Sequence, residues 1–261
     1  MLNKLLKHEF KATARLLIPL YLVLLVFTIM DKIVLGLDIF KGVLSIIPGL
    51  ITFGYVISII AIIMVTFILM IMRFYKNLMT DEGYLMFTLP VKSHQLINSK
   101  LLVSIFWTVA SILAVIGSIY IVIATPEITN EFIEDLKLGW AEIEKAFGGQ
   151  RYLLVIEMII MIIFSLINSS LMIYVSIAVG QLFNGHKLLG AFLSYIGITT
   201  ILQIAGTLLL FFANLIFSDL LTEITSTVTI VLPFSLLAIA VLNVIFYWVT
   251  NYIFKNKLNL E

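Results

Sequence analysis

The sequence predicts an all-α, polytopic membrane protein with six transmembrane helices, and three observations lead to this fold class. Hydrophobic residues make up 62% of the 261 residues, whereas about 45–50% is usual in soluble domains. They gather in six continuous apolar runs, and a helix of roughly 20 apolar residues is enough to cross a bilayer. Within these runs polar and apolar residues do not alternate with period two, which argues against a β-barrel.

The six runs define the expected spans. The first run is the shortest, and we expect flanking residues on both sides to complete its span. They lie near Arg15–Met30, Val43–Met72, Leu101–Thr125, Tyr152–Val179, Leu188–Phe217 and Ile224–Phe254. Six spans put both termini on one side, and that side holds eleven of the 16 basic residues. The positive-inside rule therefore places both termini in the cytoplasm. We interpret residues 1–261 as a single transmembrane domain of a multi-pass plasma-membrane protein.

The first 14 residues, MLNKLLKHEFKATA, are predicted to form a short amphipathic helix that lies in the membrane interface. One helical face carries apolar side chains and another carries lysines, which is typical of interfacial helices. The apolar set is Leu2, Leu5, Leu6 and Phe10, and the basic set is Lys4, Lys7 and Lys11. The alternative is an ordinary basic flank before the first span.

Residues 73–100 form the expected cytoplasmic segment between spans two and three, and its first part, RFYKNLMTDEGYLMFTLP, mixes charged and aromatic residues. Thr80 is suited to cap a helix whose first residues, Asp81 and Glu82, complement the helix dipole. Pro90 ends that helix. Exposed aromatic and acidic side chains together favour a protein-docking surface. A helix resting on lipid headgroups is the alternative, but anionic lipids would repel its two acids.

Residues 126–150 form the largest expected external segment, opened by Pro126 and closed by Gly148-Gly149. Apolar residues recur at helical spacing between acids, which predicts an amphipathic helix on the outer surface. These apolar residues are Phe132, Leu136, Trp140, Ile143 and Phe147. The helix could recognise substrate or cap the helix bundle, and we favour the cap.

No residues with a catalytic or metal-binding pattern are found in the sequence. Cysteine is absent, and the three histidines have no metal-ligand spacing. Glu157 is the only acid well inside an apolar run, and a position near the outer interface favours a structural role over a substrate or proton site. The stretch GQLFNGHK, residues 180–187, departs from the phosphate-binding motif at its lysine and hydroxyl positions. We expect a tight loop there, no nucleotide site in this chain and no nucleic-acid partner.

Two spans carry polar residues along one helical face, and polar groups in hydrocarbon are usually turned toward partners or water. In span five the face is formed by Thr199, Gln203, Thr207 and Asn214, which we interpret as candidate substrate-pathway residues. In span four it is formed by Ser165, Asn168, Ser169, Met172 and Ser176. Interhelical packing is the alternative in both cases, and it is favoured for span four.

Two stretches, LLKHEFKATARLLIPLY and RFYKNLMTDEGYLMFTLPVKSHQLINSKLL, resemble the permease subunits of ABC type 2 exporters from Gram-positive bacteria. The six-span layout agrees over the whole length, while the specific motif covers residues 73–102. The resemblance implies a dimer of permeases, homomeric or with a sister chain, in membrane lipid, and a separate cytoplasmic ATPase that holds ATP and Mg. It makes the segment 73–100 a coupling helix and the N-terminus a connecting helix, and it puts spans two and five near the central pathway. The implied ATPase-coupling residues are Asp81, Glu82, Tyr84, Phe87, Leu89 and Pro90.

The leading functional hypothesis is thus a permease subunit, without enzymatic activity of its own, in an ATP-driven exporter. It would move an amphiphilic substrate, such as a peptide antimicrobial, a drug or a lipid, by alternating access. The alternative is a non-transporting immunity or sensor protein that holds a partner through the same cytoplasmic segment. A membrane enzyme is disfavoured because the catalytic groups are missing.

Overall fold

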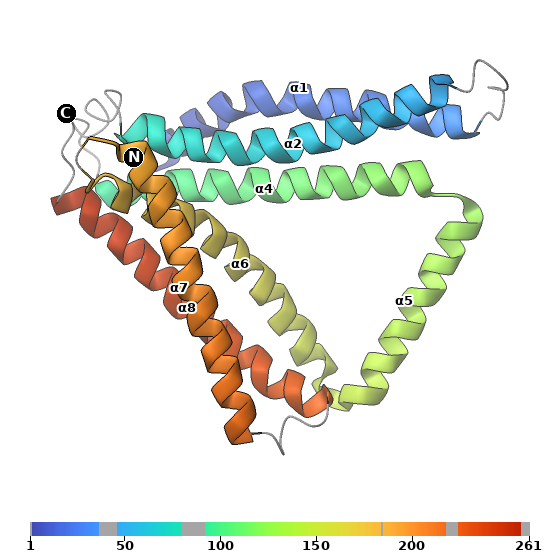
Figure 1. Ribbon diagram of the computed structural model, residues 1–261. Coiled ribbons are helices and arrows are strands. Elements are labelled where there is room, and N and C mark those ends of the chain that lie inside the picture. Colours follow the sequence, from blue (N-terminus) through green and yellow to red (C-terminus); the bar gives the residue numbers. More distant parts are fainter. Residues whose placement is uncertain (1, 37–45, 80–91, 184, 218–223, 257–261) are drawn as a thin grey trace. The chain divides into compact units, whose positions relative to one another are not determined.

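The computed structural model describes residues 2–36, 46–79, 92–183, 185–217 and 224–256, and every regular element in these ranges is a helix. Figure 1 shows the helices in chain order. They are α1 (Leu2–Gly36), α2 (Ile46–Met79), α4 (Ser93–Ile123), α5 (Pro126–Phe147), the 3-10 turn η2 (Gly148–Gln150), α6 (Arg151–Gly180), α7 (Lys187–Phe217) and α8 (Ile224–Asn256).

The prediction of an all-helical chain with six helices long and apolar enough to cross a membrane is confirmed for the described residues. Within the described ranges, six helical stretches are long and apolar enough to cross a membrane, and each overlaps one of the six predicted spans. The fourth stretch, Pro126–Gly180, also contains the segment that we predict to be external. Several are longer than a bilayer requires: the 35 residues of α1 extend for about 52 Å at about 1.5 Å per residue, against a hydrocarbon core of about 30 Å. The surplus turns extend beyond the core and can carry polar groups.

The N-terminal residues are the clearest case of such an extension. Residues 2–14 are helical, but they continue into the first span without a break, so they are the first turns of α1 and not a separate helix. Their location in the membrane interface stays a prediction. Pro19 lies within α1, and membrane helices tolerate such a residue because neighbouring groups satisfy the freed carbonyl.

The chain divides into two compact units, which are described separately, and the prediction of a single domain stays a prediction. The first unit comprises Met1–Arg73 and Asn98–Leu136, and the second comprises Phe74–Ile97 and Lys137–Glu261. The first therefore contains α1 with most of α2 and α4. The second contains α6, α7 and α8 with the last turns of α2 and the first turn of α4.

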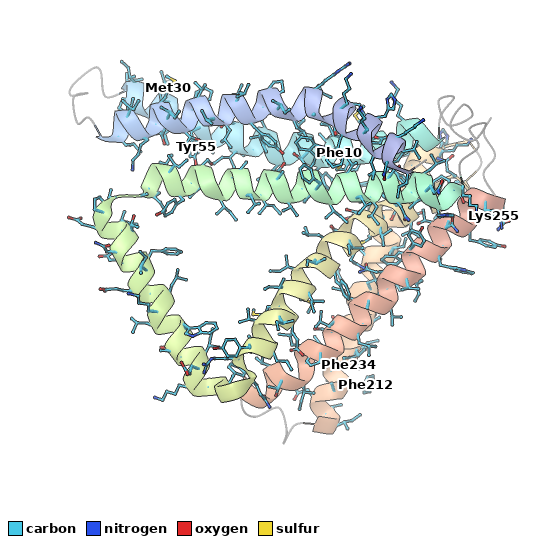
Figure 2. All side chains as sticks on the ribbon, turned by 180° about the vertical axis from the view of Figure 1, so that it is seen from behind. Phe10, Met30, Tyr55, Phe212, Phe234 and Lys255 are labelled. Atoms are coloured by element: carbon cyan, nitrogen blue, oxygen red, sulfur yellow. The ribbon has the colours of Figure 1, made fainter. Side chains whose placement is uncertain are left out.

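The first unit combines an apolar core with hydrogen bonds between its helices. Two apolar clusters lie along α1, α2 and α4; their buried members are Leu17, Met70, Val103 and Trp107, then Leu24, Tyr55 and Ile62. Ser111 of α4 is hydrogen-bonded at 2.8 Å to Tyr21 of α1 and at 2.8 Å to Thr66 of α2. Figure 2 labels Phe10 and Tyr55, which come from this unit. Interhelical hydrogen bonds of this kind hold membrane helices together where the hydrophobic effect does not.

The second unit is built around α6, which packs against both α7 and α8. Gly180 ends α6 at a close approach: a Cβ built there would overlap the backbone N and Cα of Ala191 in α7. Gly185, with a φ of +95°, supports the turn between the two helices, because glycine enters this region without a Cβ clash. The most hydrophobic window of α7 is 0% buried and that of α8 is 6% buried. Phe212 and Phe234, labelled in Figure 2, lie on these two exposed helices.

The predicted helix within residues 126–150 is present as α5, which begins at Pro126 and ends at Phe147, and no residue of α5 is buried. Phe132 and Leu136 of the predicted apolar face are exposed. Arg151, at the start of α6, pairs with Glu144 at 2.5 Å and lies 4.8 Å from the centre of the Tyr152 ring. The external location of α5 stays a prediction.

Candidate functional site

The predicted coupling residues themselves lie outside the described residues, but both helices that flank them are described. Asp81, Glu82, Tyr84, Phe87, Leu89 and Pro90 all fall in the range 80–91. The last turns of α2 precede this range and the first turns of α4 follow it. These two helix ends therefore carry the observable part of the site.

A buried ion cluster joins the three helices of the first unit near these ends. The Glu9 carboxylate of α1 accepts hydrogen bonds from Lys100 Nζ of α4 at 2.8 Å and from Arg73 Nη1 of α2 at 3.1 Å. Glu9 is 7% exposed and Lys100 is 4% exposed. Buried charges are costly unless they are paired and hydrogen-bonded, so each of these groups depends on the others.

The sequence analysis treated Glu9 only as part of a basic, amphipathic segment and missed its role. A signal was available: the buried residues of α1 fall on one stripe, at steps of four, four, seven, four and three. They are Glu9, Thr13, Leu17, Leu24, Thr28 and Asp31. This stripe is the buried side of α1, and Leu6 and Phe10 of the predicted apolar face are partly buried beside it, packed against the apolar cluster of Leu17. Glu9 and Asp31 lie outside the apolar run predicted for the first span, so the search for acids inside such runs, which singled out Glu157, did not reach them, although both are buried in α1.

Asp31 and Lys32 hold the opposite end of α1. Thr52 of α2 donates a hydrogen bond of 2.6 Å to the Asp31 carboxylate, which is 1% exposed. Lys32 Nζ donates to the backbone carbonyls of Val122 and Ala124, at 3.2 and 2.5 Å. The first unit is thus fastened by charged groups at both ends of α1.

The flanks of the coupling segment also have partners in the second unit. Phe74, the residue after Arg73, stacks on Tyr174 of α6 with ring centres 3.7 Å apart, and its edge meets Phe254 of α8 at 5.6 Å. At the start of α4, Ser93 donates a hydrogen bond of 2.9 Å to the side-chain carbonyl of Asn251. The helices on both sides of residues 80–91 are therefore anchored by named contacts.

The candidate pathway residues of span five lie on a helix whose surface is open. Gln203, Thr207 and Asn214 are exposed and Thr199 is half-buried. The hydroxyls of Thr199 and Thr207 donate hydrogen bonds to carbonyls of α7 itself. These hydroxyl groups therefore need no hydrogen-bond partner from another helix. Their assignment to a substrate pathway stays a prediction.

The polar residues of span four favour the packing interpretation. Asn168 donates to Asn243 of α8 at 3.0 Å, and Asn243 in turn donates to the carbonyl of Phe164 at 3.1 Å. Ser176 is buried and bonds within its own helix. These contacts join α6 to α8.

The stretch GQLFNGHK forms the short connection between α6 and α7, since one helix ends at Gly180 and the next begins at Lys187. Among the described residues, no group of three or more histidine, cysteine or carboxylate side chains is placed to hold a metal ion. Comparison with known proteins identifies no match among protein families, curated proteins or solved structures.

Proposed function

We propose that this chain is the membrane-spanning permease subunit of an ATP-driven exporter, coupled to a separate cytoplasmic ATPase through residues 80–91. The proposal includes a second permease, identical or a sister chain, and an amphiphilic substrate moved by alternating access. ATP and Mg would be held by the partner ATPase. Six apolar helices and the resemblance of residues 73–102 support this class.

The observation that carries the proposal is the anchoring of the two helix ends around the coupling segment. Arg73 and Lys100, on opposite sides of the segment, bind the same buried carboxylate of Glu9 in the first unit. Phe74 and Ser93 contact Tyr174 and Asn251 in the second unit. A force applied to residues 80–91 would consequently reach both units through short, specific contacts, which is what transmission from an ATPase requires.

The open surface of α7 supports the paired-permease part of the proposal. Its most hydrophobic window is 0% buried, although Gln203 and Asn214 lie on it. Neither amide side chain has a hydrogen bond to another described residue. Polar groups at membrane depth are placed toward protein or water. A second permease would cover the open surface of α7, and a water-accessible pathway would hydrate the two amides.

The coupling role can be tested by co-purification in mild detergent, with mass spectrometry of the proteins that are retained. We expect Tyr84→Ala with Phe87→Ala to reduce recovery of an ATPase and to abolish substrate-stimulated ATP hydrolysis, because truncation of buried aromatic anchors costs about 2 kcal/mol or more. Asp81→Lys with Glu82→Lys should also reduce recovery by reversing the charge of the docking surface.

The matched control is Phe132→Ala with Trp140→Ala, which removes two aromatic rings from α5, where no residue is buried. It should leave ATPase recovery unchanged. Equal recovery and hydrolysis in wild type and both coupling variants would overturn the exporter proposal. Recovery of a partner without ATPase motifs would favour the immunity or sensor protein.

Orientation is tested separately, since the native chain has no cysteine. Single cysteines at Asn130 and Asn256, both exposed, are treated with an impermeant thiol reagent on intact cells. We expect labelling at position 130 alone. Labelling at position 256 alone would reverse the topology and exclude residues 80–91 as a cytoplasmic docking site.

A further inference from the structure

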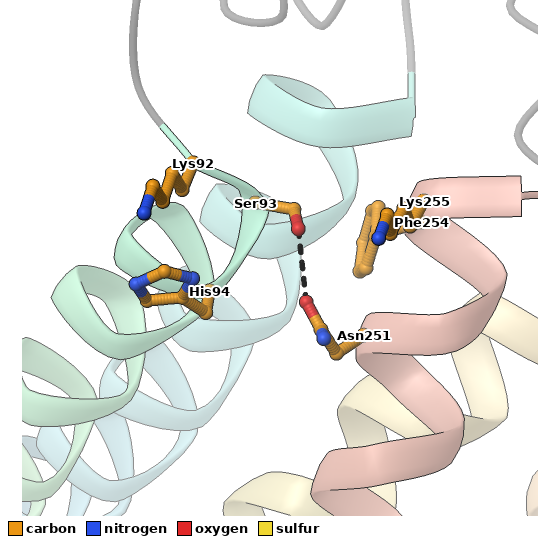
Figure 3. Close-up of a pocket in the computed structure, with 6 residues that line it drawn as sticks. All are labelled: Lys92, Ser93, His94, Asn251, Phe254 and Lys255. Atoms are coloured by element: carbon orange, nitrogen blue, oxygen red, sulfur yellow. Dashed lines mark hydrogen bonds between the residues drawn. The ribbon is translucent and has the colours of Figure 1, made fainter.

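A cationic pocket of about 610 Å³ lies in the second unit, between the start of α4 and the end of α8. The described residues that line it are Lys92, Ser93, His94, Asn251, Phe254 and Lys255. Figure 3 shows Lys92 and His94 on the α4 side and Phe254 and Lys255 on the α8 side. Because it adjoins the ends of two membrane helices, it lies near the membrane surface that we predict to be cytoplasmic.

The described residues that line the pocket carry an excess of positive charge. Lys92 and Lys255 are exposed, and neither forms an ion pair with another described residue. No carboxylate is among the described lining residues. Two lysines that line one pocket, with no acid among its described lining residues, attract an anion, and the dipole at the start of α4 has the same sign.

The uncharged lining residues add a hydrogen-bond donor and an apolar wall. Asn251 accepts the hydroxyl hydrogen of Ser93 through its carbonyl oxygen at 2.9 Å, the bond drawn in Figure 3. Its amide nitrogen is therefore left as a donor. Phe254 is 5% exposed and is held against Phe74 by an edge-to-face contact at 5.6 Å. The pocket thus offers cations and a donor beside a fixed aromatic surface.

We infer that this pocket binds the phosphate group of an anionic membrane phospholipid. A phosphodiester suits the two lysines and the Asn251 amide, and the glycerol and first acyl carbons suit the face of Phe254. Basic pockets between membrane helices on the cytoplasmic side are suited to such headgroups. A soluble phosphate would use the same cations but would leave the apolar wall without a partner. Lys92, which lines the pocket, directly follows residues 80–91 in the sequence, so bound lipid would contact the chain at the end of the proposed coupling segment.

The test is native mass spectrometry of the full chain in mild detergent, titrated separately with dioleoylphosphatidylglycerol, dioleoylphosphatidylcholine and inorganic phosphate. The two lipids share their acyl chains and differ in net charge. We expect phosphatidylglycerol to bind more tightly than phosphatidylcholine. Lys92→Gln with Lys255→Gln should weaken phosphatidylglycerol binding by roughly thirtyfold, because each lysine near an anionic headgroup contributes about a fivefold factor. Lys92→Arg with Lys255→Arg should retain binding.

The matched control is Lys137→Gln with Lys145→Gln, which removes the same charge from exposed positions on α5. It should leave phosphatidylglycerol binding unchanged. All four lysines are exposed, so the variants are expected to fold, and circular dichroism checks this. Equal losses in the two glutamine variants would overturn the site, as would undiminished binding in both. If the two lysines are needed for binding of inorganic phosphate but not for binding of lipid, the pocket is an anion site whose ligand is a soluble phosphate, and the lipid proposal is overturned.

Discussion

The two units of the molecule satisfy their polar groups in different ways. In the first unit, Thr13 and Thr28 bond within α1, but several other polar side chains of α1, α2 and α4 reach across to neighbouring helices. They extend from Glu9 with its two cations at one end to Asp31 with Thr52 at the other. In the second unit, α6 makes such contacts with α8, while α7 keeps its hydroxyls on its own backbone and leaves two amides exposed.

The difference indicates which surface is complete within one chain. When a membrane helix buries charged and hydroxyl groups against its neighbours, its packing partners are fixed within the same chain, because lipid cannot form hydrogen bonds with these groups. A helix with exposed amides at membrane depth needs protein or water from elsewhere. We therefore interpret the first unit as internally stabilised and the α7 surface as the part that is completed on assembly.

The largest expected effect comes from the ion cluster. Glu9→Gln removes the carboxylate charge that the buried Lys100 ammonium contacts at 2.8 Å, and breaking a buried pair in this way costs about 3–5 kcal/mol. We expect a large fall in the thermal unfolding temperature of the protein in nanodiscs, measured by tryptophan fluorescence. A further change of Lys100→Met should recover part of the lost unfolding temperature, because it removes the buried ammonium group.

The matched control for this experiment is Glu144→Gln, which removes the Arg151 pair. The Glu144 side chain is 51% exposed, and exposed ion pairs contribute about 1 kcal/mol or less. If Glu9→Gln lowered the unfolding temperature no more than Glu144→Gln does, the ion cluster would not stabilise the first unit, and the contrast between the two units would be wrong.

The next effect tests the second unit at the α6–α7 turn. A methyl group on Gly180 would overlap the backbone of Ala191, and backbone atoms cannot rotate away. Overpacking of this kind costs about 1–3 kcal/mol, so Gly180→Ala should lower the unfolding temperature in the same nanodisc assay. Gly206, on the same helix as Ala191, has nothing within 4 Å of a built Cβ. Gly206→Ala should leave stability unchanged or raise it by up to about 1 kcal/mol, and equal effects would show that the close approach is not needed.

The fold was more accessible from the sequence than the site, for a physical reason. The bilayer imposes a length and an apolar composition on every span, so six helices could be predicted from hydropathy alone. The partners of a single buried charge depend on helix rotation and on residues far away in sequence. Glu9 meets Lys100 across 91 positions, and nothing in the two stretches that contain these residues indicates that they pair. The coupling residues Asp81 to Pro90 were proposed from composition and resemblance, and they lie outside the described residues.

A smaller effect concerns the hydroxyl contacts in the middle of the first unit. Ser111→Ala removes the partner of both Tyr21 and Thr66. Hydrogen bonds between membrane helices contribute about 0.6 kcal/mol on average and up to about 1.7, so the expected loss lies in or slightly above this range. Ser165, which is exposed on α6, provides the control, and Ser165→Ala should have no measurable effect on unfolding temperature. Identical results for the two serines would show that the hydroxyl contacts add nothing to the first unit.

The smallest expected effect on stability concerns the surface that we assign to assembly and transport. Gln203→Leu and Asn214→Leu remove exposed amides that have no hydrogen bond to another described residue, and surface changes of this kind usually shift stability by less than about 0.5 kcal/mol. We expect the unfolding temperature of the single chain to stay constant while transport or substrate range changes, because the amides would face a pathway or a second permease. Ile201→Leu, at an exposed apolar position of the same helix, controls for altered lipid contact and should leave transport intact. A fall in stability with normal transport would mean that these amides serve packing within the chain, and the distinction between an internally satisfied first unit and an open α7 would then be wrong.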